Sequence, residues 1–69
     1  MKGRYKWHSH TVDELFYVIN GEILIGIKDQ PGMKLRAGEL AVIPAGVEHC
    51  PESSGESRVL MFEKKTNKP

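Results

Sequence analysis

The sequence has none of the covalent links that commonly stabilise a small fold. Its 69 residues include one cysteine, Cys50, which excludes an internal disulfide. A hydrophobic core built from so few residues supplies only about 3–5 kcal/mol, so such a chain is expected to gain stability from a metal ion or a second subunit. The length also leaves room for only one core. We therefore expect a single domain over residues 1–69, with its core at about 3–63 and a polar tail at 64–69.

An excess of charge of one sign is missing as well. Ten Lys and Arg residues face nine Asp and Glu residues, which gives no electrostatic reason to expect a nucleic acid or a membrane surface as a partner. The longest apolar run, residues 15–19, is far shorter than the roughly 20 residues of a membrane-spanning helix. The first ten residues contain no apolar stretch of the kind found in signal peptides. Together with the single cysteine, these absences predict a cytoplasmic protein.

What the sequence does contain is a series of short β-strand patterns without a helical repeat. Residues 15–19 are apolar, β-branched and aromatic, and they end at Asn20-Gly21, a dipeptide typical of the turn between two antiparallel strands. We therefore expect a hairpin with residues 22–28, where isoleucine occupies every second position from Ile23. The later strand segments are residues 33–36, 40–43, 47–50 and 58–62. The pattern predicts an all-β fold, a sandwich or barrel of about seven short antiparallel strands.

All three histidines lie beside these strand patterns. His8 and His10 are two residues apart, so on an extended strand both imidazoles lie on the same face and can share one ion. Glu14 stands at the head of the apolar strand and can add a carboxylate, while His49 follows a rigid Pro-x-Gly turn and can add a ligand from a distant strand. Three imidazoles and a carboxylate suit manganese, iron, nickel, copper or zinc better than calcium or magnesium. The spacing alone leaves open that these are exposed strand and loop residues.

Two segments resemble the sequence motifs of the cupin superfamily. Residues 8–14 read His-Ser-His-Thr-Val-Asp-Glu and precede Gly21, which is similar to the first cupin motif, His-x-His-x(3,4)-Glu-x(6)-Gly. Residues 38–49 read Gly-Glu-Leu-Ala-Val-Ile-Pro-Ala-Gly-Val-Glu-His, which is similar to the second motif, Gly-x(5)-Pro-x-Gly-x(2)-His. The resemblance extends over nearly the whole chain and is to small single-domain microbial cupins, a group that includes mannose-6-phosphate isomerase-like members.

This resemblance implies a jelly-roll-like β-barrel that holds one divalent transition metal ion, which would be Mn, Fe, Ni, Zn or Cu. By carry-over of the motifs, the ligands would be His8, His10, Glu14 and His49. Cupin domains usually carry one or two strands before the first motif, whereas only residues 1–5 are available here. We therefore expect a barrel that lacks the usual N-terminal strands and has an exposed sheet edge.

Strand parity predicts apolar residues on the outside of this barrel. If His8 and His10 face the lumen, Tyr5 and Trp7 face the other way. Leu15, Tyr17 and Ile19 likewise alternate with Glu14 and with the two residues that share its face. An apolar outer surface needs cover, so we expect a homodimer, as in dimeric cupins. The alternative is a compact monomer whose aromatic side chains fold over the sheet edge.

The motifs specify a site better than they specify a reaction, because the cupin fold hosts many chemistries. In one hypothesis the protein is a metalloenzyme acting on a small oxyanionic or carbonyl substrate, as a dioxygenase, isomerase or decarboxylase, with Glu14 as a catalytic proton acceptor. Phe16, Val18 and Val47 would then form the apolar wall of the substrate pocket, and Lys6 would hold a substrate carboxylate or phosphate. In the other hypothesis the protein is a non-catalytic small-molecule-binding module or a metal-stabilised structural domain.

Overall fold

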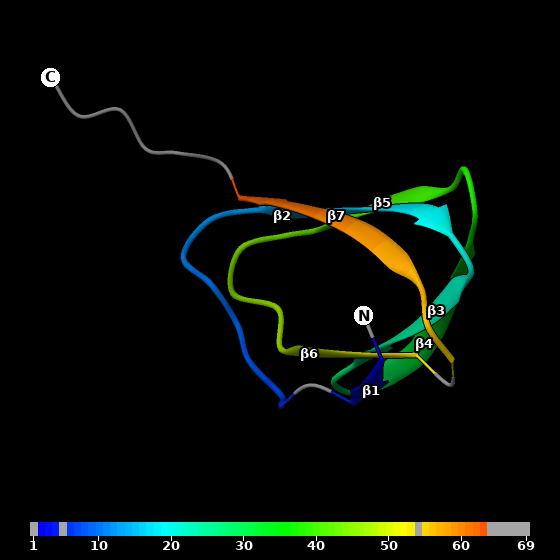
Figure 1. Cartoon of the computed structure of the whole chain (residues 1–69). Helices are drawn as coiled ribbons and strands as arrows, with labels where there is room; N and C mark the ends of the chain where they lie inside the picture. The colour runs from blue at the N-terminus through cyan, green and yellow to red at the C-terminus, as the bar shows by residue number, and fades with distance from the viewer. Residues whose placement is uncertain (1, 5, 54, 64–69) are drawn as a thin grey trace, which may run out of the picture.

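A computed structural model shows the chain as two antiparallel β-sheets that face each other (Figure 1). It describes residues 2–4, 6–53 and 55–63, so the tail expected at 64–69 lies outside the described residues. Sheet A has the strand order β1-β6-β3-β4, and sheet B has the order β5-β2-β7. The strands are β1 (Gly3–Arg4), β2 (Glu14–Asn20), β3 (Glu22–Ile27), β4 (Gln30–Arg36), β5 (Leu40–Ile43), β6 (His49–Ser53) and β7 (Arg58–Glu63). The expected all-β fold of seven short antiparallel strands is confirmed.

The described residues contain only strands, turns and loops, and no helix among them has the length and hydropathy to span a membrane. Alternating side chains of the two sheets supply the hydrophobic core. Phe16 and Val18 of β2 point inward from sheet B, and Ile23 and Ile25 of β3 are buried with them from sheet A. Burial of each such side chain contributes about 1.5–3 kcal/mol. The alternation of buried and exposed positions along β2 and β3 is the period-two pattern read from the sequence.

The expected hairpin at Asn20-Gly21 is wrong. β2 pairs with β5 and β7, whereas β3 pairs with β4 and β6, so the chain crosses between the sheets at this point. Gly21 has a φ of 84°, and a Cβ there would lie 2.8 Å from the Cβ of Ser57. The Asn-Gly dipeptide indicates a left-handed backbone conformation. Such a conformation is used both in hairpin turns and where a chain crosses between two sheets, so it does not distinguish them.

The hairpin that the chain does form joins β3 to β4. Its turn contains Asp29, a non-glycine residue with a φ of 61°, a conformation that aspartate tolerates better than most residues. β4 begins at Gln30, earlier than the expected residue 33, and includes Pro31. Proline is acceptable there because β4 is an edge strand of sheet A, where one side of the backbone has no ladder partner.

Strand β6 also differs from the segment expected at residues 47–50. It starts at His49 and continues through Pro51 to Ser53. The N–H of His49 bonds to the carbonyl of His8, on the side away from β3. Backbone direction alternates along a strand, so the nitrogen of Pro51 points to that same side and its missing proton leaves the β3 ladder intact. The proline therefore does not end the strand.

Candidate metal centre

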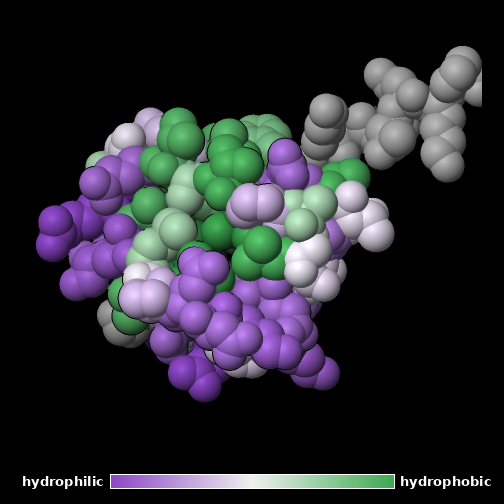
Figure 2. All heavy atoms as spheres, turned by 180° about the vertical axis from the view of Figure 1, so that it is seen from behind, coloured by the Kyte–Doolittle hydropathy of each residue, from purple (hydrophilic) through white to green (hydrophobic). Residues whose placement is uncertain are grey.

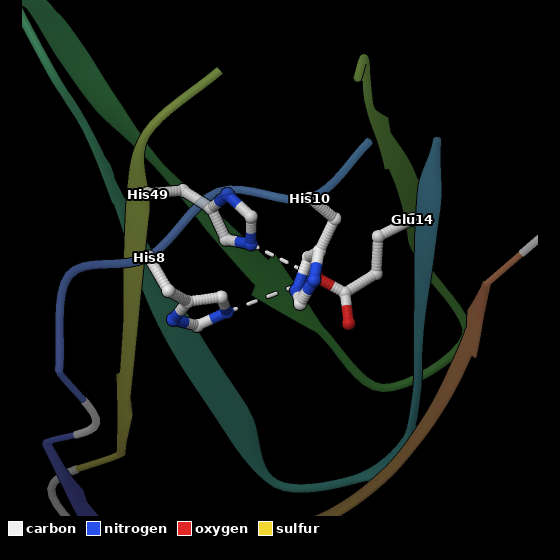
Figure 3. Close-up of side chains that lie close together, drawn as sticks. All are labelled: His8, His10, Glu14 and His49. Atoms are coloured by element: carbon white, nitrogen blue, oxygen red, sulfur yellow. Dashed lines mark hydrogen bonds and ion pairs between the residues drawn. The ribbon is translucent and has the colours of Figure 1, made fainter. Parts of the chain in front are cut away.

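Four side chains converge at one end of the two sheets (Figure 3). His8 and His10 lie on the segment between β1 and β2, Glu14 is the first residue of β2 in sheet B, and His49 is the first residue of β6 in sheet A. One ligand atom from each lies within 4.8 Å of the others. The predicted ligand set is therefore brought together, with donors from both sheets.

Backbone hydrogen bonds fix the segment that carries the first two histidines. The N–H of His8 donates to the carbonyl of His49 at 3.0 Å, and the N–H of His49 donates back to the carbonyl of His8 at 2.9 Å. The N–H of Gly46 donates to the carbonyl of His10 at 2.8 Å. The segment between β1 and β2 thus runs beside the turn that leads into β6. The ladder places the imidazoles of His8 and His49 with their ring centroids 4.4 Å apart.

Two of the imidazoles are oriented by backbone carbonyls. The Nδ1 of His8 lies 2.7 Å from the carbonyl oxygen of Lys6, and the Nδ1 of His49 lies 2.9 Å from the carbonyl oxygen of Val47. A carbonyl can only accept a hydrogen bond, so the proton of each ring belongs on Nδ1. Each Nε2 then presents a lone pair toward the centre of the cluster.

The third imidazole lies beside a carboxylate. The Nδ1 of His10 lies 3.3 Å from Oε1 of Glu63, the last residue of β7. The Nε2 of His10 is buried and has no hydrogen-bond partner among the described residues, although it lies 3.4 Å from Oε1 of Glu14. A buried polar atom of this kind is unfavourable unless something binds it.

The donor set fits a metal ion. Oε1 of Glu14 lies 4.0 Å from Nε2 of His8 and 2.9 Å from Nε2 of His49, so three imidazole nitrogens surround one carboxylate oxygen. Nε2 of His49 lies at hydrogen-bond distance from this oxygen, whereas Nε2 of His8 and Nε2 of His10 lie further away. Glu14 and His49 are both buried, which increases the cost of leaving these groups unmatched. A divalent transition metal ion matches three imidazoles and one carboxylate.

The four residues predicted to line a substrate pocket occupy different surroundings. Phe16 is fully buried, and its ring lies edge-on to that of His49 with the centroids 5.8 Å apart. Val18 is also fully buried, two positions further along β2, and Val47 is half-buried against the core. Lys6 is exposed. Phe16 thus contacts the ring of His49, and the backbone carbonyls of Val47 and Lys6 orient His49 and His8. The role of all four residues in a substrate pocket stays a prediction.

Sequence reasoning missed Glu63. Its Cα is paired with that of Glu14 in the ladder between β2 and β7, so both side chains lie on the inner face of sheet B. Met61 shares this parity and is paired with Phe16, yet it is half exposed, so it does not fill the core. Period-two reading of β7 groups these residues on one face. Only the register between β2 and β7 shows that this face leads to the histidines.

A surface hollow lies away from the four ligand candidates. It has a volume of about 440 Å³ and is lined by Lys2, Asn20, Glu56, Ser57 and Arg58. Asn20 ends β2, whereas the metal-ligand candidate Glu14 begins it, so the hollow lies at the opposite end of the strand. It is therefore not the pocket expected beside the ligands.

Taken together, two facing β-sheets and a cluster of three histidines and one glutamate define a class of small all-β domain with a candidate metal site. The sequence matches the cupin domain family over residues 2–63, and the chain belongs to this family. The resemblance drawn from the two motifs is confirmed.

Known proteins similar to this chain are longer than it. A cupin-2 domain containing protein from Shewanella frigidimarina matches its structure with a TM-score of 0.83 and 38% identity, over 93% of this chain and 64% of that chain. The uncharacterized protein YdbB of Bacillus subtilis is 46% identical over 48 residues, 68% of this chain and 42% of its own length. The 3-hydroxyanthranilate 3,4-dioxygenase of Bos taurus is 28% identical over 65 residues, 90% of this chain and 23% of its own length. The chain thus spans less than half the length of these two curated relatives.

Proposed function

We propose that the protein is a metal-dependent cupin enzyme in which His8, His10, Glu14 and His49 hold one divalent transition metal ion. The observation that supports this most strongly is the orientation of the three imidazoles. Each has an oxygen atom beside Nδ1. Their Nε2 atoms converge on one oxygen of a buried carboxylate, and these four atoms form a set that one cation can bind.

The four ligand candidates differ in burial, and this difference shows which side of the cluster is open to solvent. Glu14 and His49 are buried, whereas the side chains of His8 and His10 are 32% and 29% exposed. A small substrate therefore approaches from the side of His8 and His10. Phe16 packs its ring against that of His49 on the buried side, where it excludes water.

The bound ion would supply Lewis-acid or redox chemistry at positions that the four ligands leave open. The chain's own contribution is to orient the substrate and to move a proton. Figure 3 shows Glu14 facing the histidines through one carboxylate oxygen, the Oε1 atom of the three short distances. Its second oxygen is the atom that we assign to proton transfer with the substrate, with Glu14 as the catalytic residue.

The substrate class is a small oxyanionic or carbonyl compound. Among the dioxygenase, isomerase and decarboxylase reactions, similarity to a 3-hydroxyanthranilate 3,4-dioxygenase over 90% of this chain favours the dioxygenase. A non-catalytic binding or structural module is the second candidate. It is favoured by the position of the 440 Å³ hollow, which lies away from the four ligand candidates.

Metal content tests the proposal. Untagged protein, expressed without added metal, is analysed by plasma mass spectrometry beside the variants His49→Ala and Glu48→Ala. We expect about one transition metal ion per chain in the wild type and in Glu48→Ala, whose side chain is exposed, and none in His49→Ala. Equal metal content in all three proteins would exclude this site. Oxygen consumption with 3-hydroxyanthranilate and with simple 2-oxo acids then separates a dioxygenase from a module that only binds.

A second copy of the chain is the partner we propose for sheet B. Across this sheet, Leu15 is paired with Val42 and Phe62. The next outward row joins Tyr17 to Leu40 and Leu60. Residues 40, 42, 60 and 62 are at least 42% exposed. Figure 2 shows hydrophobic residues gathered toward the upper side of the molecule, where sheet B lies in Figure 1.

Two rows of apolar side chains without a charged residue suit burial against an identical surface, because a twofold interface is self-complementary. Trp7 adds a further exposed aromatic side chain, packed beside Gly26 of sheet A, and Tyr5 lies outside the described residues. Light scattering at micromolar concentration is expected to give a dimer mass for the wild type and a monomer mass for Val42→Lys. Leu24→Lys, at an exposed site of sheet A, is the matched control and should remain dimeric. A monomeric wild type would contradict the dimer.

A reducing cytoplasmic location belongs to the same proposal. The support is compositional, since the sequence contains a single cysteine, the buried Cys50.

A further inference from the structure

The three histidines of the cluster are not held in the same way. His8 and His49 each place Nδ1 against the backbone carbonyl two residues earlier, Lys6 and Val47. Those contacts are built into the main chain and exist whatever the side chains at those positions are. Within the described part of the chain His10 has no such carbonyl, and its Nδ1 lies instead 3.3 Å from a carboxylate oxygen of Glu63.

Glu63 contacts His10 from strand β7, which carries none of the four ligand candidates. It ends β7, whose ladder with β2 pairs it with Glu14. The two glutamates therefore stand side by side on the inner face of sheet B, with His10 contacting both of them. Oε1 of Glu14 is 3.4 Å from Nε2 of His10, and Oε1 of Glu63 is 3.3 Å from its Nδ1.

We propose that Glu63 is a positioning residue of the metal site, and that its carboxylate holds His10 in the tautomer whose Nε2 binds the ion. This inference rests on the metal site proposed for the four ligands. A histidine ligand commonly donates its second ring N–H to a carboxylate or carbonyl, which fixes the ring and its tautomer. Glu63 supplies that acceptor for the one ligand whose own backbone does not.

Charge supports the same role. A divalent ion bound by three neutral imidazoles and the carboxylate of Glu14 leaves one positive charge at the site. Glu63 adds a second carboxylate beside a ligand, which brings the total to zero. Its side chain is 49% exposed, so solvent weakens this interaction, and the expected effect is moderate. Removal of such outer partners typically lowers metal affinity by about 10–100-fold.

The test compares Glu63→Ala and Glu63→Gln with a matched control. Glu22→Ala removes a glutamate of equal exposure, 49%, which pairs with Arg36 of β4 instead of with a ligand. The dissociation constant for Zn²⁺ is measured by competition with a chelating dye. We expect it to rise about 10-fold in Glu63→Ala, to rise less in Glu63→Gln, which keeps a side-chain oxygen acceptor, and to be unchanged in Glu22→Ala.

Imidazole nitrogen NMR of the metal-free protein gives the second reading. In the wild type and in Glu63→Gln, His10 is expected as the tautomer with its proton on Nδ1. In Glu63→Ala it is expected to lose that preference, while His8 and His49 keep theirs because backbone carbonyls hold them. A merely structural role for Glu63 would not change one histidine's tautomer selectively.

The outcomes separate the two proposals. A wild-type protein that binds no transition metal would overturn the proposed function, and the tautomer of His10 would still show whether Glu63 positions that ring. Normal Zn²⁺ binding with the same dissociation constant in Glu63→Ala would overturn the inference about Glu63 alone. An equal loss of affinity in Glu22→Ala would overturn it too, because general surface charge would then explain the effect.

Discussion

The two ends of the barrel both carry the chain across from one sheet to the other, yet they are closed by different interactions (Figure 1). At one end, the segment before β2 and the turn before β6 bring together three imidazoles and a buried carboxylate. At the other end, the chain turns at Gly21, whose Cα lies so close to Ser57 that a Cβ would be 2.8 Å from the Cβ of that serine.

The second end is satisfied by the protein alone. The hydroxyl of Ser57 donates to the hydroxyl of Ser53 at 3.1 Å, and Ser53 in turn donates to the backbone carbonyl of Gly55. Every donor in this chain of contacts has an acceptor. At the ligand end, by contrast, Nε2 of His10 is buried and has no hydrogen-bond partner among the described residues. The comparison suggests that one end depends on an ion for its stability and the other on close packing, and each dependence can be tested separately.

The largest expected effect is that of the metal ion on the ligand end. An ion that binds only the folded state, present at about 1,000 times its dissociation constant, adds about 4 kcal/mol to the free energy of unfolding. In a domain of this size that raises Tm by roughly 15–30 °C. Differential scanning fluorimetry with and without Zn²⁺ measures the shift. His49→Ala should show no shift, and a wild-type Tm that ignores metal would show that folding and binding are not coupled.

The second prediction concerns the packed end. Gly21→Ala places a Cβ in a left-handed position, which costs about 1–2 kcal/mol, and presses it against the Cα and Cβ of Ser57. Overpacking adds about 1–3 kcal/mol, so we expect a total loss of about 3 kcal/mol in denaturant unfolding.

The metal dependence of this variant sharpens the comparison. Because Gly21 follows β2 at the end opposite Glu14, the rise in Tm with Zn²⁺ should be the same in Gly21→Ala as in the wild type. Gly38→Ala is the matched control, since Gly38 has a similar φ of 86° but a Cβ there would meet no atom within 4 Å. An equal loss in both variants would mean that backbone strain, and not contact with Ser57, limits the corner.

The sequence predicted the ligand end much better than the packed end. Four ligand candidates could be named because the two motifs place metal-binding residue types at fixed distances around rigid turns, and the fold brings those residues together. Strand positions also followed from the period of two, although β4 and β6 run through prolines that sequence rules treat as stops. Proline excludes a strand only where its nitrogen must donate, and the sequence does not say which side of the strand has a partner.

The role of Asn20-Gly21 and that of Glu63 could not be read from the sequence for one shared reason. The sequence predicts the left-handed backbone conformation at Gly21. Whether β2 pairs with β3 or with β5 and β7 depends on how the whole chain packs. Glu63 likewise acts through its register opposite Glu14, which is a contact between distant segments. A short sequence pattern predicts backbone torsion angles and the face of a strand on which a side chain lies. Which distant strands pair, and in what register, depends on how the complete sheets assemble.

The smallest predicted effect belongs to the hydroxyl contacts of the packed end. Ser57→Ala removes the hydrogen bond from Ser57 to Ser53, while the hydroxyl of Ser53 keeps its acceptor, the backbone carbonyl of Gly55. The loss of one such hydrogen bond is expected to cost only about 1 kcal/mol in denaturant unfolding. The Zn²⁺-dependent rise in Tm should again equal that of the wild type. A reduced rise would show that the two ends of the barrel are coupled through the core between them, with Phe16 beside His49 as the first contact to test.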